Sequence, residues 1–136
     1  MSKNSTANHS TAIELGFEDE FLDHYTMMVE SMEVMIEDLS KQTMQKRCVE
    51  ELCRVFHTIV SVSTFLKIEP MIRLATLVEN ELKQLKDKNT PVNNETINWL
   101  FKISKMFAKW QTNMKTGEEL AKVEYSLLKR PDLEKI

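Results

Sequence analysis

Large apolar residues recur every three or four positions along most of this chain, which is the period of an α-helix with one buried face. The stretch 52–68 keeps this spacing throughout. Its apolar stripe consists of Leu52, Phe56, Ile59, Val62 or Ser63, and Leu66. The pattern predicts a helix over residues 43–66, and Thr43 is a candidate N-cap because its hydroxyl can accept a hydrogen bond from the first turn.

The same period predicts three more long helices, over residues 17–39, 70–85 and 95–115. Each of these segments has apolar residues on one face and polar residues on the other. Their buried stripes are, in chain order, Phe21, Tyr25, Met28, Met32, Met35 or Ile36, and Leu39; then Met71, Leu74, Ala75, Val78, Leu82 and Leu85; then Ile97, Leu100, Phe101, Ser104, Phe107 or Ala108, and Met114.

Local signals support the helix boundaries. Pro70 suits a first helical turn, where its missing N–H costs little. Asn93 or Asn94 can cap the helix that follows it, and Gly117 suits a helix end. Beyond that glycine, residues 118–128 are predicted to form a shorter fifth helix, which packs onto the bundle through Leu120, Val123 or Glu124, Leu127 and Leu128.

Four amphipathic helices with short links predict an all-α fold, an antiparallel up-and-down four-helix bundle with an additional short C-terminal helix. The chain of 136 residues fits one such domain, predicted over residues 16–128. Residues 1–15 are rich in Ser, Thr and Asn and are predicted to be a disordered lead-in. Residues 129–136 contain Pro131 and are predicted to fray as a tail.

Composition narrows the classes of partner and compartment. The net charge of −3 offers no concentrated basic face, so we predict no nucleic-acid partner. No stretch approaches the roughly 20 apolar residues that span a membrane, and the polar N-terminus lacks the apolar core of a signal peptide. Cys48 and Cys53 lie about 140° apart around a helix. We therefore predict reduced thiols in a cytoplasmic protein without a membrane partner.

His57 is the clearest candidate for chemistry. It follows Phe56 and lies about 100° further round the helix, beside the buried stripe and within reach of water. An imidazole held in this way can act as a nucleophile, a proton carrier or a metal ligand, although a half-exposed histidine often has no role. Cys53 lies four positions earlier, a spacing that two zinc ligands can use, but no further ligands are identifiable and we predict no metal site.

The runs 56–59 (Phe-His-Thr-Ile) and 63–66 (Ser-Thr-Phe-Leu) resemble the active helix of histidine phosphotransfer (HPt) domains. That family's pattern is roughly a small or apolar residue, His-Thr/Ser-Leu/Ile-Lys-Gly, then small residues and Phe-Leu-Gly. The run 74–82 is similar to the family's next helix, which ends in an apolar-Glu-x-x-Leu pattern. The run 96–114 resembles the fourth helix of the phosphotransfer domain in chemotaxis-type histidine kinases. The resemblance covers about residues 16–117.

The resemblance implies a histidine phosphotransfer protein of a two-component phosphorelay. His57 would accept a phosphoryl group and pass it to or from a receiver-domain aspartate, while Glu79 would accept a hydrogen bond from the imidazole and so fix its tautomer. The implied partners are a response-regulator receiver domain, a histidine kinase, or both, and a monomer is expected. No cofactor is implied, since Mg²⁺ is expected only in the receiver. Without a kinase or nucleotide-binding portion, the chain is expected to be a phosphocarrier and no independent enzyme.

The implied docking face surrounds His57 and consists of Cys53, Arg54, Val60, Ser61, Thr64 and Lys67. The family usually has Lys three residues after the histidine and Gly at the fourth, where this chain has Val60 and Ser61. Arg54 or Lys67 is a candidate replacement for that lysine. The apolar Val60 favours an alternative, a degenerate HPt-like adaptor that binds a receiver or kinase without carrying phosphate. A third alternative is a helical interaction or dimerisation module in which His57 is incidental.

Overall fold

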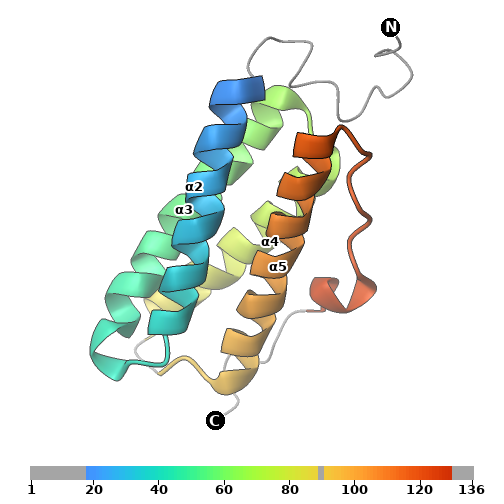
Figure 1. Cartoon of the computed structure of the whole chain (residues 1–136). Coiled ribbons are helices and arrows are strands. Elements are labelled where there is room, and N and C mark those ends of the chain that lie inside the picture. The colour runs from blue at the N-terminus through green and yellow to red at the C-terminus, as the bar shows by residue number, and fades with distance from the viewer. Residues whose placement is uncertain (1–17, 89–90, 130–136) are drawn as a thin grey trace, which may run out of the picture.

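The computed structural model describes residues 18–88 and 91–129, which form a bundle of four long helices that run alternately up and down (Figure 1). The helices are α2 (Glu18–Asp38), α3 (Gln45–Leu66), α4 (Glu69–Asp87) and α5 (Asn94–Thr116). α3 packs against both α2 and α4, and α2 also packs against α5. The predicted all-α fold, an antiparallel four-helix bundle, is therefore confirmed.

Some predictions fall outside the described residues. These are the disordered lead-in over residues 1–15 and all but the first residue of the fraying tail over residues 129–136. Within the described part of the chain, no helix is long and apolar enough to cross a membrane.

Most helix boundaries lie within a few residues of the predicted ones. Pro70 is in the first turn of α4, Asn93 caps α5 by accepting a hydrogen bond from Thr96 N at 2.8 Å, and Gly117 ends that helix with a φ of 77°. The predicted cap Thr43 is wrong. That residue lies inside the 3-10 turn η2 (Gln42–Met44), and the N-cap of α3 is Met44, which makes no side-chain hydrogen bond to the helix.

The apolar stripes of the four helices meet in one core. Phe56 of α3 contacts Phe107 of α5 edge to face, with ring centroids 5.5 Å apart, and Phe107 contacts Trp110 at 5.1 Å. The Tyr25 hydroxyl of α2 donates a hydrogen bond to Phe107 O at 2.7 Å, so its burial leaves no unsatisfied phenol. Where the pattern left two positions open, the buried residues are Ile36, Ser63 and Phe107.

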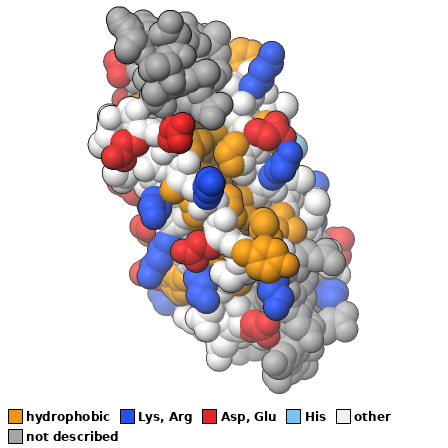
Figure 2. Space-filling model, turned by 90° about the vertical axis from the view of Figure 1, so that its right-hand side faces the viewer, with side chains coloured by type: hydrophobic (Ala, Val, Ile, Leu, Met, Phe, Trp, Pro, Cys, Tyr) orange, Lys and Arg blue, Asp and Glu red, His pale blue; other side chains and the backbone are white. Residues whose placement is uncertain are grey.

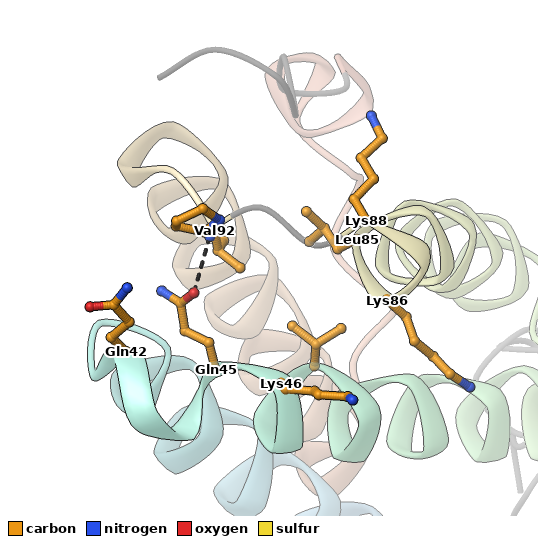
Figure 3. Close-up of a pocket in the computed structure, with 9 residues that line it drawn as sticks. Gln42, Gln45, Lys46, Leu85, Lys86, Lys88 and Val92 are labelled. Atoms are coloured by element: carbon orange, nitrogen blue, oxygen red, sulfur yellow. Dashed lines mark hydrogen bonds between the residues drawn. The ribbon is translucent and has the colours of Figure 1, made fainter.

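Gln45 joins the two connections at one end of the bundle (Figure 3). Its Nε2 donates to Leu39 O at 2.7 Å, just after α2, and its Oε1 accepts from Val92 N at 3.2 Å, just before α5. One amide thereby satisfies two backbone groups from segments that are distant in sequence.

The C-terminal segment departs most from prediction. Residues 118–124 are not helical, and the only helical turn after them in the described chain is the short 3-10 turn η3 (Tyr125–Leu128). Trp110 Nε1 donates to Ala121 O at 2.8 Å, and Ala121 N donates to Asn113 Oδ1 at 2.8 Å. These two side chains occupy backbone groups that a fifth helix needs for its own hydrogen bonds. The predicted helix over residues 118–128 is therefore corrected to an extended strap that ends in η3.

The strap, residues 118–128, returns along α5 (Figure 1). Trp99 Nε1 donates to Leu127 O at 3.0 Å, which holds its far end. Of the residues predicted to pack onto the bundle, Leu127 is buried, Leu120 and Val123 are half-buried, and Glu124 and Leu128 are exposed. Because the strap covers a second side of α5, both tryptophans of that helix are buried although they lie outside its predicted stripe.

Candidate functional site

His57 is presented on the outside of α3 by a buried neighbour. Phe56 is fully buried against Phe107, which fixes the rotation of α3 at this level. The next side chain therefore points away from the core, and 69% of the His57 side chain is exposed. The imidazole is thus held by a rigid helix and remains accessible to a reacting partner.

Glu79 approaches His57 from α4. Its neighbour Val78 is fully buried, and the Glu79 side chain is only 9% exposed at the edge of the α3–α4 contact. Glu79 Oε2 lies 2.9 Å from His57 Nδ1, across 22 residues of sequence. A neutral imidazole that donates its Nδ1–H to this carboxylate has the lone pair of Nε2 free on the solvent side. The pairing that the resemblance implied is present in the structure.

Lys83 is a member of this site that the sequence argument missed. Its Nζ lies 3.4 Å from Glu79 Oε2, the same oxygen that His57 Nδ1 contacts. The signal was available, because Lys83 follows Glu79 by four residues and such pairs meet on one face of a helix. A single buried carboxylate oxygen therefore joins an imidazole and an ammonium group.

The predicted replacements for the family's lysine are placed differently. Arg54 Nη2 pairs with Glu51 Oε2 at 3.1 Å on the exposed face of α3. Lys67 is exposed just past the end of α3 and has the left-handed backbone φ of 62°. Lys83 is the basic side chain that contacts the His57–Glu79 pair.

The other predicted docking residues divide into two groups. Ser61 and Thr64 are exposed on the His57 side of α3, and Val60 is half-buried against the core. The placement of Cys53 on this face is corrected, because only 8% of the residue is exposed and it packs in the core between the helices. Charged groups of α4, Lys83 and Lys86 among them, are close enough to act on its thiol, so Cys53 faces the α3–α4 contact.

Both cysteines are free thiols in the structure. Burial raises the pKa of Cys53 and of Cys48, which lowers the fraction of reactive thiolate at neutral pH. Among residues 18–88 and 91–129, no three His, Cys, Asp or Glu side chains are grouped so that they can hold a metal ion.

Comparison of the chain with protein-family models, with curated proteins and with solved structures finds no match. What the protein does must therefore be inferred from the chemistry of its own residues. The His57–Glu79–Lys83 cluster combines an exposed nucleophile, a buried acceptor that orients it, and a balancing positive charge. Such a cluster can accept an electrophilic group on Nε2 and leaves catalysis of the transfer to whatever partner supplies that group.

Proposed function

We propose that this protein is a histidine phosphotransfer protein of a two-component phosphorelay. His57 accepts a phosphoryl group and passes it to or from a receiver-domain aspartate, and Glu79 orients the imidazole. The partners are a response-regulator receiver domain, a histidine kinase, or both. We also propose a cytoplasmic location, because the receiver domain and the histidine kinase with which the protein would exchange phosphoryl groups act in the cytoplasm.

The distance of 2.9 Å between His57 Nδ1 and Glu79 Oε2 is the observation that carries this proposal. An incidental surface histidine needs no buried carboxylate on a second helix, and burying a carboxylate is costly unless it is paired. Because 69% of the His57 side chain is exposed, its second ring nitrogen is also accessible to a partner. Together these features favour a phosphotransfer site over a plain interaction module in which His57 is incidental.

Transfer from a receiver aspartate to His57 exchanges one bond to phosphorus for another. The Nε2 lone pair of His57 attacks phosphorus of a receiver acyl phosphate, the N–P bond forms as the O–P bond breaks, and the aspartate carboxylate leaves with the electron pair. Nδ1 keeps its proton throughout, so the phosphorylated ring is positively charged and faces the Glu79 carboxylate. Transfer in the opposite direction reverses the same bond changes.

Lys83 adjusts the charge of this pair. Because its ammonium group contacts the same oxygen of Glu79, it reduces the net negative charge that the imidazole meets. Charge on the phosphoryl oxygens is neutralised mainly by the receiver, which brings Mg²⁺ and a lysine. In-line geometry likewise depends on docking of the partner.

The alternative function is a degenerate HPt-like adaptor that binds a receiver or kinase without carrying phosphate. The observation that favours it is Val60, which is half-buried one turn after His57 and offers an apolar contact where the family has a lysine. Ser61 is exposed beside it, and its small side chain leaves room for a docked partner.

Phosphoryl uptake by the purified full chain tests the proposal. The protein is mixed with a small phosphoramidate donor and, separately, with a panel of phosphorylated receivers. Intact mass is measured at neutral pH and again after acid treatment, beside a His57→Gln control. An acid-labile gain in mass that the control lacks is the expected result. No gain from any donor, with receiver binding still detectable, would overturn phosphotransfer in favour of the adaptor.

A further inference from the structure

A groove of about 310 Å³ runs between α5 and the strap. Its lining combines basic side chains with an apolar floor. The lining residues are Lys102, Lys105, Met106 and Lys109 from α5, and Ala121, Lys122, Glu124 and Leu127 from the strap. Figure 2 shows this side of the molecule, where Lys and Arg side chains stand beside a band of hydrophobic ones.

The groove has an excess of positive charge that the protein itself does not neutralise. Its four lysines are all exposed, and in the described part of the chain none forms an ion pair with a carboxylate. Glu124 is the single acidic residue in the lining, which leaves a surplus of three positive charges. Like charges at such short spacing repel one another, so the cluster is costly to the isolated fold and favours an anionic ligand.

The three lysines of α5 are arranged along one line. They lie on the face of α5 opposite Phe107, which points into the core. From Lys102 to Lys109 the helix rises about 10 Å, which is the length of roughly three residues of extended chain. Lys122 faces this line from the strap, so charge is present on both walls.

The wall formed by the strap is fixed. Trp110, Asn113 and Trp99 of α5 hold its backbone at Ala121 and at Leu127 through hydrogen bonds of 2.8, 2.8 and 3.0 Å. The groove is therefore present before any ligand arrives, which lowers the entropic cost of binding. Tyr125 is 79% exposed and Leu128 is 47% exposed on the same strap, so the strap also carries apolar surface that is open to solvent.

We propose that this groove binds an acidic segment of a partner protein in extended conformation. Carboxylates spaced along such a segment match the line of lysines, and an apolar side chain between them contacts Met106 and Leu127. An extended chain points successive side chains to opposite sides, and the groove has lysines on both of its walls. Electrostatic complementarity of this kind sets specificity and the association rate more than affinity.

Two other occupants fit less well. A second copy would offer its acidic helix α2, which has eight acidic residues and no Lys or Arg, but α2 already packs against α3 and α5, so only part of its surface is available to another copy. A nucleic acid fits less well because domains that bind nucleic acids usually carry a net positive charge and an extended basic face, whereas this chain has a net charge of −3.

The groove is separate from the phosphotransfer site. His57 lies on the outer side of α3, whereas the lysines lie on the outer side of α5, and the contact between Phe56 and Phe107 lies between them. A segment in the groove therefore leaves His57 accessible. This inference does not depend on the proposed phosphotransfer function, and binding at the two faces can be measured independently.

The test uses the full chain and a short fluorescein-labelled peptide made of glutamates around one central leucine. Binding is measured by fluorescence anisotropy at about 50 mM salt and again at higher salt, because exposed charge pairs are screened by salt. A peptide with glutamine in place of every glutamate is the ligand control. Chemical shifts of the backbone amides and of the two indole N–H groups map the site.

A matched pair of variants separates the groove from overall charge. Lys105→Glu/Lys109→Glu changes the groove, and Lys46→Glu/Lys86→Glu makes the same change of net charge at another pocket, the one shown in Figure 3. We expect the groove variant to weaken peptide binding about tenfold and the control variant to weaken it less than about twofold. Phosphoryl uptake on His57 is expected to stay unchanged in both variants.

Several results would overturn the proposal. Equal weakening in the two variants would show that only net charge matters, and shifts confined to other helices would place the peptide elsewhere. Tighter binding of a single-stranded oligonucleotide than of the peptide would exclude an acidic segment as the occupant. Self-association in sedimentation that the groove variant abolishes would identify a second copy in its place.

Discussion

The His57 face and the lysine groove lie on opposite sides of one core, and different contacts hold them in place. On the first face, His57, Glu79 and Lys83 all stand on continuous helices, so the packing of α3 against α4 sets their positions. In the groove, one wall is the helix α5 and the other is a strap whose backbone bonds to tryptophan and asparagine side chains.

This difference affects how each face is lost. The His57 face persists as long as the bundle is folded, because its groups belong to the most deeply packed helices. The strap makes few backbone hydrogen bonds of its own, so its position depends on the three side-chain bonds from α5, and losing them would open the groove while the four helices stay folded. The variants below separate these two kinds of failure.

Removing the shared core contact is expected to have the largest effect. Phe56→Ala deletes a fully buried ring between the two faces, and we expect a loss of about 3–5 kcal/mol in the free energy of unfolding. Urea unfolding followed by circular dichroism measures it. Met27→Ala, at a side chain that is 65% exposed, is the control and should change stability by no more than about 0.5 kcal/mol. Similar losses in both variants would contradict this account of the core.

Glu79→Ala is expected to damage the His57 face alone. Without the acceptor, the imidazole loses its fixed tautomer, and we expect phosphoryl uptake to slow about 10–100-fold while peptide binding in the groove is unchanged. Uptake is followed by intact mass, and ¹⁵N shifts of the imidazole report the tautomer. Glu51→Ala, which removes only the exposed pair with Arg54, is the control. Uptake at the wild-type rate in Glu79→Ala would show that Glu79 is not needed to orient the imidazole.

Trp110→Phe is expected to damage the groove alone. The substitution keeps an aromatic ring in the core but removes the N–H that binds Ala121 O, at a cost of about 1–2 kcal/mol. We expect faster hydrogen exchange at the Ala121 amide and weaker peptide binding, with exchange in α3 and phosphoryl uptake unchanged. If the strap amides keep their protection, Trp110 does not hold the strap.

The smallest effect is expected at Tyr25, which supports both faces through the core. Burial raises the pKa of Tyr25 well above its usual value. The unfolded chain ionises this phenol at about pH 10 while the folded protein keeps it protonated, so stability is full below that pH and falls above it. Tyr25→Phe should cost about 1 kcal/mol at neutral pH, through loss of the bond to Phe107 O, and should flatten the alkaline decline. Parallel curves of unfolding free energy against pH would contradict this.

Most of the fold could be predicted from the sequence, because it follows from repetition. One buried stripe per helix fixes which residues face inward. At ambiguous positions such as Val62 and Ser63, the sequence left open only which of two neighbours is buried, and it is Ser63. The pairing of His57 with Glu79 needed more than periodicity. It came from a resemblance that placed two helices in register, since no local pattern relates residues 22 positions apart.

The errors share a cause, which is that contacts between distant side chains and backbone leave no periodic signal. Residues 118–128 have apolar spacing suited to a helix, but Trp110 and Asn113 bind Ala121 and prevent one. Cys53 was assigned to the surface because it lies one turn before His57, yet its rotation toward α4 buries it. Lys83 belongs to α4, whereas the two predicted replacement cations, Arg54 and Lys67, lie on α3 or just past its end.

The ends of α3 and α5 use the same turn with different residues. At both ends a residue with positive φ is followed by an N–H that donates to a carbonyl five residues back, Ile68 to Ser63 and Glu118 to Asn113. At the end of α5 the left-handed residue is Gly117, but at the end of α3 it is Lys67, at the place where the HPt pattern has the glycine of Phe-Leu-Gly. A side chain with a Cβ is strained in this conformation by roughly 1 kcal/mol. The last turn of the helix that bears His57 thus stores a small backbone strain, which a glycine at position 67 would release.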